Sequence, residues 1–196
     1  MTVRSAERVG YSDRIHDPAF KRYLRHTSYW SLLFAGILAV VVIVGFFIYG
    51  ETSSEMDNPQ ALYIGLGIGG MFVSIALLTI LGRARSRTWD GVVVDKYVRR
   101  RTRRERSGDN TYEVPYTEFG VVIRDQRGKN HTVTADDDDT LYEYYQVGEH
   151  VRHHKGLNTL EKYDKSRDSI IFCNACSSKN DIEDDKCFRC GCPLLK

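Results

Sequence analysis

The first 172 residues of the chain contain no cysteine, whereas the last 24 contain all five. A disulfide framework in this tail is disfavoured, because we expect the tail to be cytoplasmic, where thiols stay reduced. The cysteines that do occur are close together, which favours a local metal site over long-range cross-links.

Charged side chains are missing from two runs, residues 29–50 and 61–82, in a chain that is otherwise 28% charged. As a helix, each run of 22 residues would extend about 33 Å, enough to cross a bilayer core of about 30 Å. We therefore expect an integral membrane protein with a two-helix transmembrane hairpin over residues 29–82. Because neither run contains an ionisable side chain, the usual marker of an ion or proton pathway is absent.

Basic residues flank the two runs on one side. The ten-residue loop 51–60 between the runs has no Lys or Arg, whereas basic side chains precede the first run and follow the second: Arg4, Arg8, Arg14, Lys21, Arg22, Arg25, Arg83, Arg85 and Arg87. This distribution predicts a multi-pass protein of the cell membrane with both termini in the cytoplasm. A signal peptide is disfavoured, because 28 residues precede the first run and no small-residue cleavage site ends it.

Residues 1–28 form a basic arm in which we expect a short amphipathic helix. Asp17 suits the N-cap and Pro18 the first helical position. Phe20, Tyr23 and Leu24 then fall on one face, with basic residues around them. This pattern predicts a helix at the membrane interface whose arginines face anionic headgroups. A short solvated helix is the alternative.

Three glycines of the second run have the spacing of a dinucleotide-binding fingerprint: Gly65, Gly67 and Gly70. We reject that interpretation, because the fingerprint needs a preceding strand and a solvated helix N-terminus. Gly65 and Gly69 instead form a small-xxx-small face that matches Ala35 and Ala39 of the first run. We expect close packing of the two helices there, with homo-oligomer formation through the same face as an alternative.

Residues 83–172 change to short strands separated by turns. Apolar residues alternate on one parity from Tyr112 to Tyr116 and on the other from Phe119 to Ile123, which predicts a β-bulge at Glu118–Phe119. The segment 126–130, with Gly128, predicts a hairpin turn. Further strands are expected near 151–155, 159–163 and 169–172. Five or six short antiparallel strands favour an all-β cytoplasmic domain, an OB-like or SH3-like barrel.

Three runs in this segment resemble a bacterial family of membrane-attached β-domains of unknown function: Trp89–Asp95, Tyr112–Tyr116 and Tyr145–Val151. Members of that family place the domain beside one or two transmembrane helices. The resemblance covers about 75 residues and rests on hydrophobic spacing; His153 and Lys155 depart from the pattern. It implies a fold and a membrane setting, but no activity.

Six arginines in residues 99–106 are expected at a hairpin tip: Arg99, Arg100, Arg101, Arg103, Arg104 and Arg106. Such a loop could bind a polyanion, and anionic lipid is nearer than nucleic acid. Nucleic acid is further disfavoured because no aromatic residue lies between Tyr97 and Tyr112. A solvated loop is equally consistent with this run.

The acidic run 136–139 is interpreted as a solvated turn. His153 and His154 point to opposite faces of a strand, so joint metal binding by these two histidines is disfavoured.

The cysteines of residues 173–196 have metal-ligand spacing. Two Cys-x-x-Cys pairs are separated by ten residues, and each pair can present two thiolates to a tetrahedral Zn²⁺. The tail resembles the zinc ribbons at the ends of bacterial membrane proteins, which implies Cys173, Cys176, Cys187 and Cys190 as ligands. Cys192 is then a spare thiol or a competitor for the place of Cys190. A closed four-cysteine site has no open position for a substrate, so the Zn²⁺ is expected to be structural.

The sequence offers little that suggests an enzyme, since it has no phosphate loop, no histidine–nucleophile constellation and no open metal site. We expect a non-enzymatic, membrane-anchored interaction or adaptor protein that binds a protein partner through its β-domain or zinc ribbon. The alternative is a module that binds anionic lipid or nucleic acid through residues 99–106.

Overall fold

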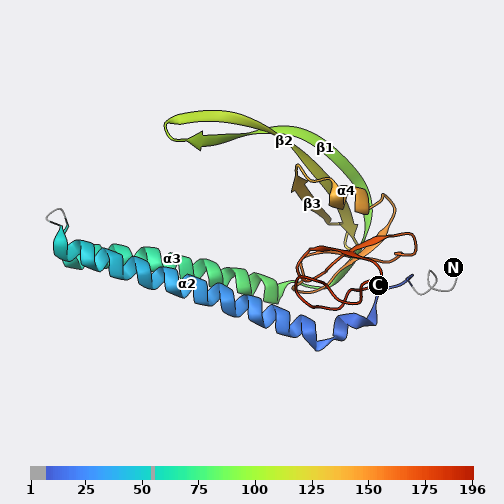
Figure 1. Cartoon of the computed structure of the whole chain (residues 1–196), viewed down its shortest axis with the longest axis horizontal. Coiled ribbons are helices and arrows are strands. Elements are labelled where there is room, and N and C mark those ends of the chain that lie inside the picture. Colours follow the sequence, from blue (N-terminus) through green and yellow to red (C-terminus); the bar gives the residue numbers. More distant parts are fainter. Residues whose placement is uncertain (1–7, 54–55) are drawn as a thin grey trace.

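The structure is a computed structural model that describes residues 8–53 and 56–196. Two long helices form a hairpin at one end, and a β-sheet with the C-terminal residues forms a compact body at the other (Figure 1). The elements in chain order are η1 (Asp13–His16), α2 (Pro18–Thr52), α3 (Asn58–Arg85), β1 (Trp89–Ser107), β2 (Asn110–Asp125), β3 (Asn130–Asp136), α4 (Thr140–Tyr144), β4 (His150–His153), β5 (Glu161–Lys162), β6 (Ile170–Phe172) and β7 (Lys179–Asp181).

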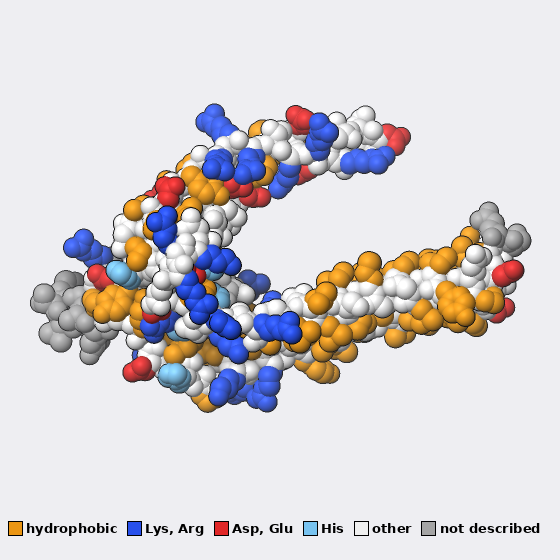
Figure 2. Space-filling model, turned by 180° about the vertical axis from the view of Figure 1, so that it is seen from behind, with side chains coloured by type: hydrophobic (Ala, Val, Ile, Leu, Met, Phe, Trp, Pro, Cys, Tyr) orange, Lys and Arg blue, Asp and Glu red, His pale blue; other side chains and the backbone are white. Residues whose placement is uncertain are grey.

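Helix α2 runs without a break from the basic N-terminal region through the first apolar run. It begins as expected at Pro18, and the Asp17 carboxylate accepts a hydrogen bond of 2.7 Å from the backbone N–H of Ala19. Both α2 and α3 are long and apolar enough to cross a membrane. Hydrophobic side chains cover the outside of the hairpin (Figure 2), because most of them are exposed rather than packed in a core.

Small residues lie where α2 and α3 meet. The buried residues of the two helices include Ala35, Ala39, Gly65 and Gly69. A Cβ atom added to Gly65 would lie 3.0 Å from Cβ of Phe46, and one added to Gly69 would lie within 3.3 Å of the carbonyl oxygen of Ala39. A side chain at either position would therefore force the neighbouring atoms of α2 to shift.

The sheet is antiparallel and open, so the expectation of a closed barrel is wrong. Its strand order is β3-β2-β1-β4-β5, and β6 pairs with β7 in a separate two-stranded sheet. Among the described strands, edge strands β3 and β5 do not pair with each other. β5 has only two residues, which is too short to close a barrel with β3. Much of the length of β1 and β2 instead extends past the residues that pair with β3 and β4.

This outer part of β1 and β2, residues 99–117, is called the arm. Within it, β1 and β2 pair only with each other, from Arg100 opposite Thr117 to Ser107 opposite Asn110, whereas β3 pairs with β2 from Glu118 onward. The arm curves away from the sheet toward the side on which the helices project (Figure 1). A two-stranded ribbon has two open edges, so the arm is the least supported part of the sheet.

The β-bulge lies at a different position from the one predicted. The pairing is regular at Glu118–Phe119, and the register shifts between Val93 and Asp95 instead. The apolar alternation changes parity near Phe119 because the strand leaves the sheet there. From Phe119 to Ile123 the apolar side chains lie on the face that the sheet core covers, whereas those of the arm lie on the opposite face.

Two hydrophobic cores lie side by side in the compact body. The first joins the sheet with α4 and β6: Val93, Val121, Ile123, Tyr144, Tyr145, Val151, Leu160 and Phe172. The second belongs to the C-terminal ribbon, residues 173–196, and its buried members are Phe20, Leu157, Ile171, Cys173, Ala175, Ile182, Cys187, Cys192, Leu194 and Leu195. Adjacent residues of β6 thus enter different cores.

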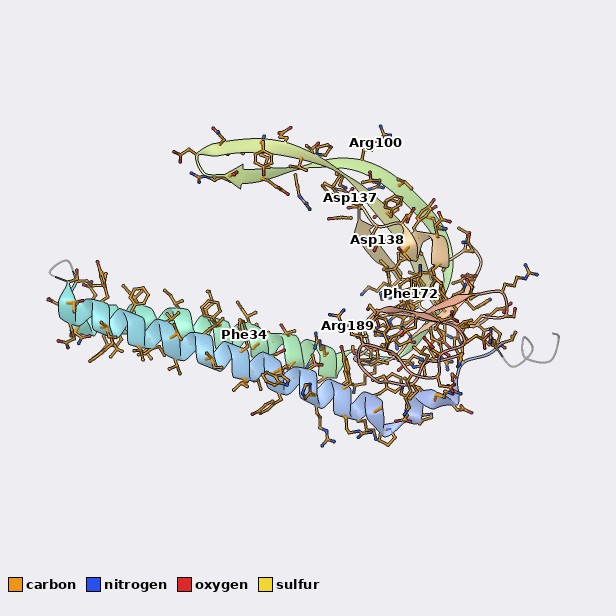
Figure 3. All side chains as sticks on the ribbon, viewed as in Figure 1. Phe34, Arg100, Asp137, Asp138, Phe172 and Arg189 are labelled. Atoms are coloured by element: carbon orange, nitrogen blue, oxygen red, sulfur yellow. The ribbon has the colours of Figure 1, made fainter. Side chains whose placement is uncertain are left out.

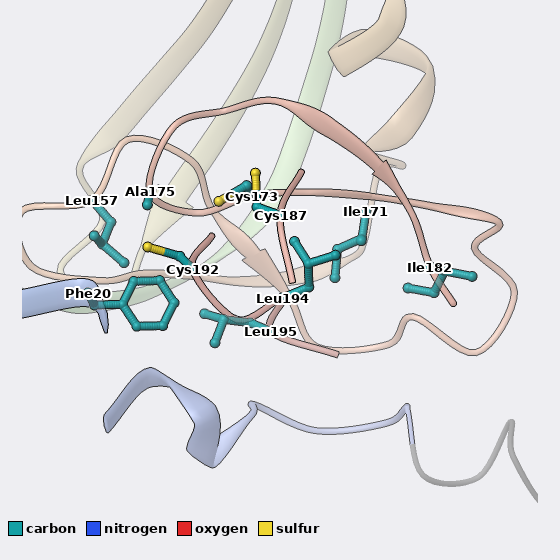
Figure 4. Close-up of a cluster of buried hydrophobic side chains, with 10 residues drawn as sticks. All are labelled: Phe20, Leu157, Ile171, Cys173, Ala175, Ile182, Cys187, Cys192, Leu194 and Leu195. Carbon is teal, nitrogen blue, oxygen red and sulfur yellow. The ribbon is translucent and has the colours of Figure 1, made fainter. Parts of the chain in front are cut away.

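Phe20 enters the ribbon core from α2, where it points toward Cys192 and Leu195 (Figure 4). Its side chain is 4% exposed, and Tyr23 and Leu24 pack against the same cluster. The apolar face that we assigned to the membrane interface is therefore covered by the ribbon. The ribbon is too small to bury its apolar side chains by itself, so its core is completed by the apolar face at the start of α2.

The end of α3 is also fixed to the compact body. The Ser86 hydroxyl accepts a hydrogen bond of 2.7 Å from the N–H of Gly156, and the Thr88 hydroxyl accepts one of 3.1 Å from the N–H of Lys155. Both helices of the hairpin therefore meet the body through specific contacts, and no free linker separates the hairpin from it.

A buried ionic cluster attaches the segment before α2 to β5. The Glu161 carboxylate accepts hydrogen bonds from the N–H of Ser12 at 2.7 Å and from Lys165 Nζ at 3.0 Å, and it lies 2.6 Å from His154 Nε2. Lys165 Nζ also donates to the carbonyl of Gly10 at 3.0 Å. Burial lowers the pKa of Lys165, and the adjacent Glu161 opposes that shift. The contact with Glu161 holds one ring nitrogen of His154 in this cluster.

Candidate metal centre

Two turns of the same design present the cysteine pairs. In the first, the N–H of Ser177 donates to the carbonyl of Cys173 at 2.8 Å; in the second, the N–H of Gly191 donates to the carbonyl of Cys187 at 2.9 Å. Ser177 has φ 61° and Gly191 has φ 69°, a left-handed conformation that glycine adopts without strain. Ser177 is held there by a 2.6 Å hydrogen bond between its hydroxyl and that of Thr159.

The β6–β7 hairpin brings the two turns together. Phe172 pairs with Lys179, so the chain reverses immediately after the first turn, and the second turn packs against the first. The Sγ atoms of Cys173, Cys176, Cys187 and Cys190 all lie within 4.8 Å of one another. This is the group of four residues that the spacing and the ribbon resemblance indicated.

The sulfur–sulfur distances suit a metal rather than a disulfide. Sγ of Cys173 lies 3.5 Å from Sγ of Cys190, and Sγ of Cys176 lies 3.5 Å from Sγ of Cys187. All five cysteines are free thiols. A tetrahedron with metal–sulfur bonds of about 2.3 Å has sulfur–sulfur edges of about 3.8 Å. Small outward movements would therefore make room for an ion among four soft donors.

Hydrogen bonds favour ionisation of one thiol, and burial opposes it at another. Although burial disfavours its charged form, the Ser178 hydroxyl at 3.0 Å and the backbone amides of Arg189 and Cys190 lower the pKa of Cys187 to about 6. Burial raises the pKa of Cys173 to about 12. A metal ion would supply the positive charge that the buried thiolates need, and its binding would release protons.

Cys192 lies outside this group. Its side chain belongs to the apolar core of the ribbon, and burial raises the pKa of its thiol. Its carbonyl accepts a 2.8 Å hydrogen bond from the N–H of Cys187. Cys192 thus supports the second turn through its backbone.

The six arginines predicted at a hairpin tip lie on strand β1, so that expectation is wrong. The turn comes later, between Ser107 and Asn110, where Gly108 has φ 60°. The run was expected in a loop because it lies between two expected strands, but its residues continue β1 as far as Ser107. The labelled Arg100 projects from the outer side of the arm, whereas Asp137 and Asp138 lie on its inner side (Figure 3).

Three of these arginines form ion pairs with glutamates of the hairpin: Arg101 with Glu118 at 3.1 Å, Arg103 with Glu105 at 2.8 Å and Arg104 with Glu113 at 3.3 Å. Arg99 lies over the ring of Tyr97, with 4.4 Å between guanidinium and ring centre. The positive charge available to a polyanion is therefore smaller than the sequence suggests.

Tyrosines of β2 share a face with some of these arginines. The sequence of β1 alone does not reveal this arrangement. Residues directly opposite each other in an antiparallel pair point to the same face. Tyr116 lies opposite Arg101, and Tyr112 lies opposite Glu105. The absence of aromatics between Tyr97 and Tyr112 therefore holds along β1 but not across the hairpin.

Comparison of this chain with protein-family models, curated proteins and solved structures found no match. Its own residues define the class: two long apolar helices, an open antiparallel sheet and a cluster of four cysteines able to hold a metal ion.

Proposed function

We propose that this protein is a membrane-anchored adaptor, not an enzyme, in which a zinc-stabilised ribbon fixes the anchor to a cytoplasmic β-domain that binds a protein partner. The observation that carries the proposal is the contact of Phe20. Helix α2 begins in the ribbon core and continues without a break into the apolar hairpin. Such a rigid connection would hold the metal site and sheet at a fixed distance from the membrane surface.

The exposure of the helical hairpin supports membrane insertion. A core helix of a soluble protein is mostly buried, whereas only 11% and 17% of the most apolar windows of α2 and α3 are buried. Large apolar side chains such as Phe34, Val41 and Leu78 are each more than 60% exposed. A bilayer would cover them. The distribution of basic residues supports cytoplasmic placement of both termini.

The donor set supports zinc. Four thiolates favour soft ions, and a tetrahedral sulfur site is typical of Zn²⁺ or iron. Isolated pairs of Cys-x-x-Cys on a small ribbon are most often zinc sites, and a closed four-cysteine site is structural. The ribbon's apolar core is small without Phe20, so metal binding and folding should be coupled.

The arm is the part of the protein best suited to bind a partner. Its two strands have open edges over residues 99–116, where no other described strand pairs with them; at Thr117 the backbone N–H and carbonyl are hydrogen-bonded to Asp137. Open edges allow a partner to add a strand. Val98 and Tyr112, 50% and 46% exposed, add apolar contact area at the base and tip.

A shortened arm tests this proposal. Deleting residues 101–106 and 111–116 removes equal lengths from both strands, joins the turn 107–110 to the pair formed by Arg100 and Thr117, and preserves the side-chain alternation. Full-length protein and this variant would be purified from detergent-solubilised native membranes. We expect a protein that accompanies the full-length chain to be absent from the variant, while zinc content and membrane fraction are unchanged.

A ribbon-surface control separates the arm from the metal module. Phe188, in the second cysteine turn, is 76% exposed, and Phe188→Ser changes the ribbon surface without entering the core. Retention of the partner by Phe188→Ser supports docking on the arm. If the partner is lost only in Phe188→Ser, the docking surface lies on the ribbon. If no protein accompanies the full-length chain, the adaptor proposal is overturned.

The second candidate function is contact of the arm with anionic lipid. The arm curves back alongside the helical hairpin (Figure 1), so a hairpin inserted in a bilayer would bring the arm into contact with the membrane. Arg99, Arg100 and Arg106 form no ion pair among the described residues. Changing these three to glutamine should weaken salt-dependent binding to phosphatidylglycerol vesicles more than the same change at Arg101, Arg103 and Arg104. Equal binding by both variants would refute this function.

A further inference from the structure

A basic groove lies where α2 leaves the ribbon. Its volume is about 710 Å³, and it is lined by Ala19, Arg22, Tyr23, Arg25, His26, Tyr29, Cys190 and Gly191. Among the described residues that line it, none is acidic, and neither Arg22 nor Arg25 has an ion pair in the described part of the chain. Figure 2 shows basic side chains gathered where the hairpin meets the compact body.

An apolar groove continues from this basic one along the same side of α2. Its volume is about 620 Å³, and its lining is almost wholly apolar: Tyr29, Leu32, Leu33, Gly36, Ile37, Val40 and Val41. Tyr29 lines both grooves. The lining residues recur every three or four positions, so they form one continuous stripe on the helix. Gly36 deepens the groove, because a Cβ atom added there would meet no atom within 4 Å.

The two grooves have the dimensions of a phospholipid. At 1.5 Å per residue, Arg25 lies about 6 Å from Tyr29 along the axis, which matches the thickness of about 5–8 Å of one headgroup layer. From Tyr29 to Val41 the helix rises about 18 Å, close to the ~15 Å of one leaflet of the hydrocarbon core.

We propose that this stripe binds one anionic phospholipid, with its phosphate between Arg22 and Arg25 and an acyl chain along Gly36. The two guanidiniums present hydrogen-bond donors that match phosphate oxygens. Trp30 Nε1 donates a 2.7 Å hydrogen bond to His26 Nε2, which orients the histidine ring at the junction of the two grooves. The inference rests on the proposed membrane anchoring and adds a specific lipid ligand to it.

The ribbon takes part in this site. Cys190, one of the four clustered cysteines, and Gly191 line the headgroup end of the groove. A four-thiolate zinc centre carries a net negative charge, so Arg22 and Arg25 have a second possible role as its counter-charges. The experiment must therefore separate loss of lipid from loss of metal.

The test is native mass spectrometry of the full-length protein in detergent, titrated with phosphatidylglycerol or phosphatidylcholine. We expect one phosphatidylglycerol to bind about tenfold more tightly than phosphatidylcholine, a preference that two basic groups near a phosphate can support. Arg22→Gln with Arg25→Gln should abolish the preference. The control pair Lys21→Gln with Arg85→Gln removes the same charge outside the groove and should retain it. Equal loss in both pairs would overturn the proposal.

Gly36→Leu tests the acyl-chain groove. It should weaken binding of both lipids, whereas Gly70→Leu, on α3 and also in open space, should not. Inorganic phosphate should compete poorly, because it lacks the acyl chain. Efficient competition by phosphate, or equal effects of the two leucines, would overturn the assignment of a phospholipid.

Two further measurements separate the proposed lipid site from a role of the arginines in metal binding and from the proposed membrane anchoring. Zinc content should be unchanged in the Arg22 and Arg25 variant; its loss would assign the arginines to the metal site and overturn the lipid site. Alkaline carbonate extraction of membranes reports anchoring independently. If the chain is extracted, the proposed anchoring fails; if it stays in the membrane without lipid preference, only the lipid site fails.

Discussion

Replacing Phe20 by alanine removes the side chain that joins α2 to the ribbon core. The ring is 4% exposed and contacts the cluster that includes Cys192 and Leu195. Truncation of a buried phenylalanine to alanine costs about 3–5 kcal/mol of folding free energy. We take the lower value of about 3 kcal/mol, because Phe20 is in the first turn of its helix, where a small shift can partly close the cavity.

That cost should appear as weaker metal binding. If the ribbon is folded only with metal, the apparent zinc affinity falls by the whole loss of stability. At about 1.4 kcal/mol per factor of ten, a loss of about 3 kcal/mol weakens zinc binding by at least about 100-fold. Competition with a colorimetric chelator, with the full-length protein in detergent, measures this ratio.

Phe188→Ala is the matched control for Phe20→Ala. Phe188 is in the same ribbon but is 76% exposed, so the same chemical change should alter stability by no more than about 0.5 kcal/mol and leave zinc affinity within about twofold. Equal zinc affinities for the two variants would refute the idea that α2 completes the ribbon core. They would mean that the ribbon folds around its metal without the helix.

Three further predictions concern the metal site, the helix contact and the sheet. Cys187→Ser should abolish tight zinc binding, whereas Cys192→Ala should keep it; loss of zinc from the latter, measured by elemental analysis, would make Cys192 a ligand. Gly65→Leu should lower the unfolding temperature in detergent, because an added Cβ atom meets Phe46 at 3.0 Å, whereas Gly67→Leu, with no atom within 4 Å, should not; equal temperatures would contradict this helix contact. Arg152 of β4 donates two hydrogen bonds to the Asp90 carboxylate, from Nε at 2.5 Å and from Nη2 at 2.8 Å, and this ion pair lowers the pKa of Asp90. Its stabilisation, about 1 kcal/mol, is therefore full above the ordinary aspartate pKa of about 3.9 and is lost as the pH falls through the lower folded value. Asp90→Asn should then lower the unfolding temperature at pH 7 but not at pH 2, and a constant difference would contradict the assignment.

Features that depend on local spacing could be predicted from the sequence. The two apolar runs are long enough to specify helices by themselves, and Asp17 and Pro18 mark the start of α2. The four clustered cysteines follow from the spacing within and between the pairs, because the geometry of each turn is set by its four residues. The turn at Gly128 has the same local origin.

Features that depend on distant partners could not be predicted in the same way. Phe20 shows the amphipathic pattern of an interfacial helix, and nothing local distinguishes a lipid surface from a protein surface as its cover. The arginines suggested a loop because the glutamates that pair with them, such as Glu113 and Glu118, lie on the partner strand. The prediction of a closed barrel was wrong for a related reason. The predicted number of five or six strands agrees with β1 to β6, but barrel closure depends on the lengths of the two edge strands.

The contact of Phe20 also changes what a domain boundary means in this chain. A boundary at residue 28, between basic arm and hairpin, falls inside α2, and a boundary at residue 173 separates Ile171 from the ribbon core that buries it. A change in the metal-bound state of the ribbon therefore acts directly on the packing of α2, and the end of α3 is attached to the same body through Ser86. Because the groove lined by Arg22 and Cys190 lies between helix and ribbon, the proposed metal binding, membrane anchoring and lipid binding would share one set of contacts. Loss of zinc should then release the start of α2 and the lipid together, while the distant Gly65 contact holds the hairpin intact.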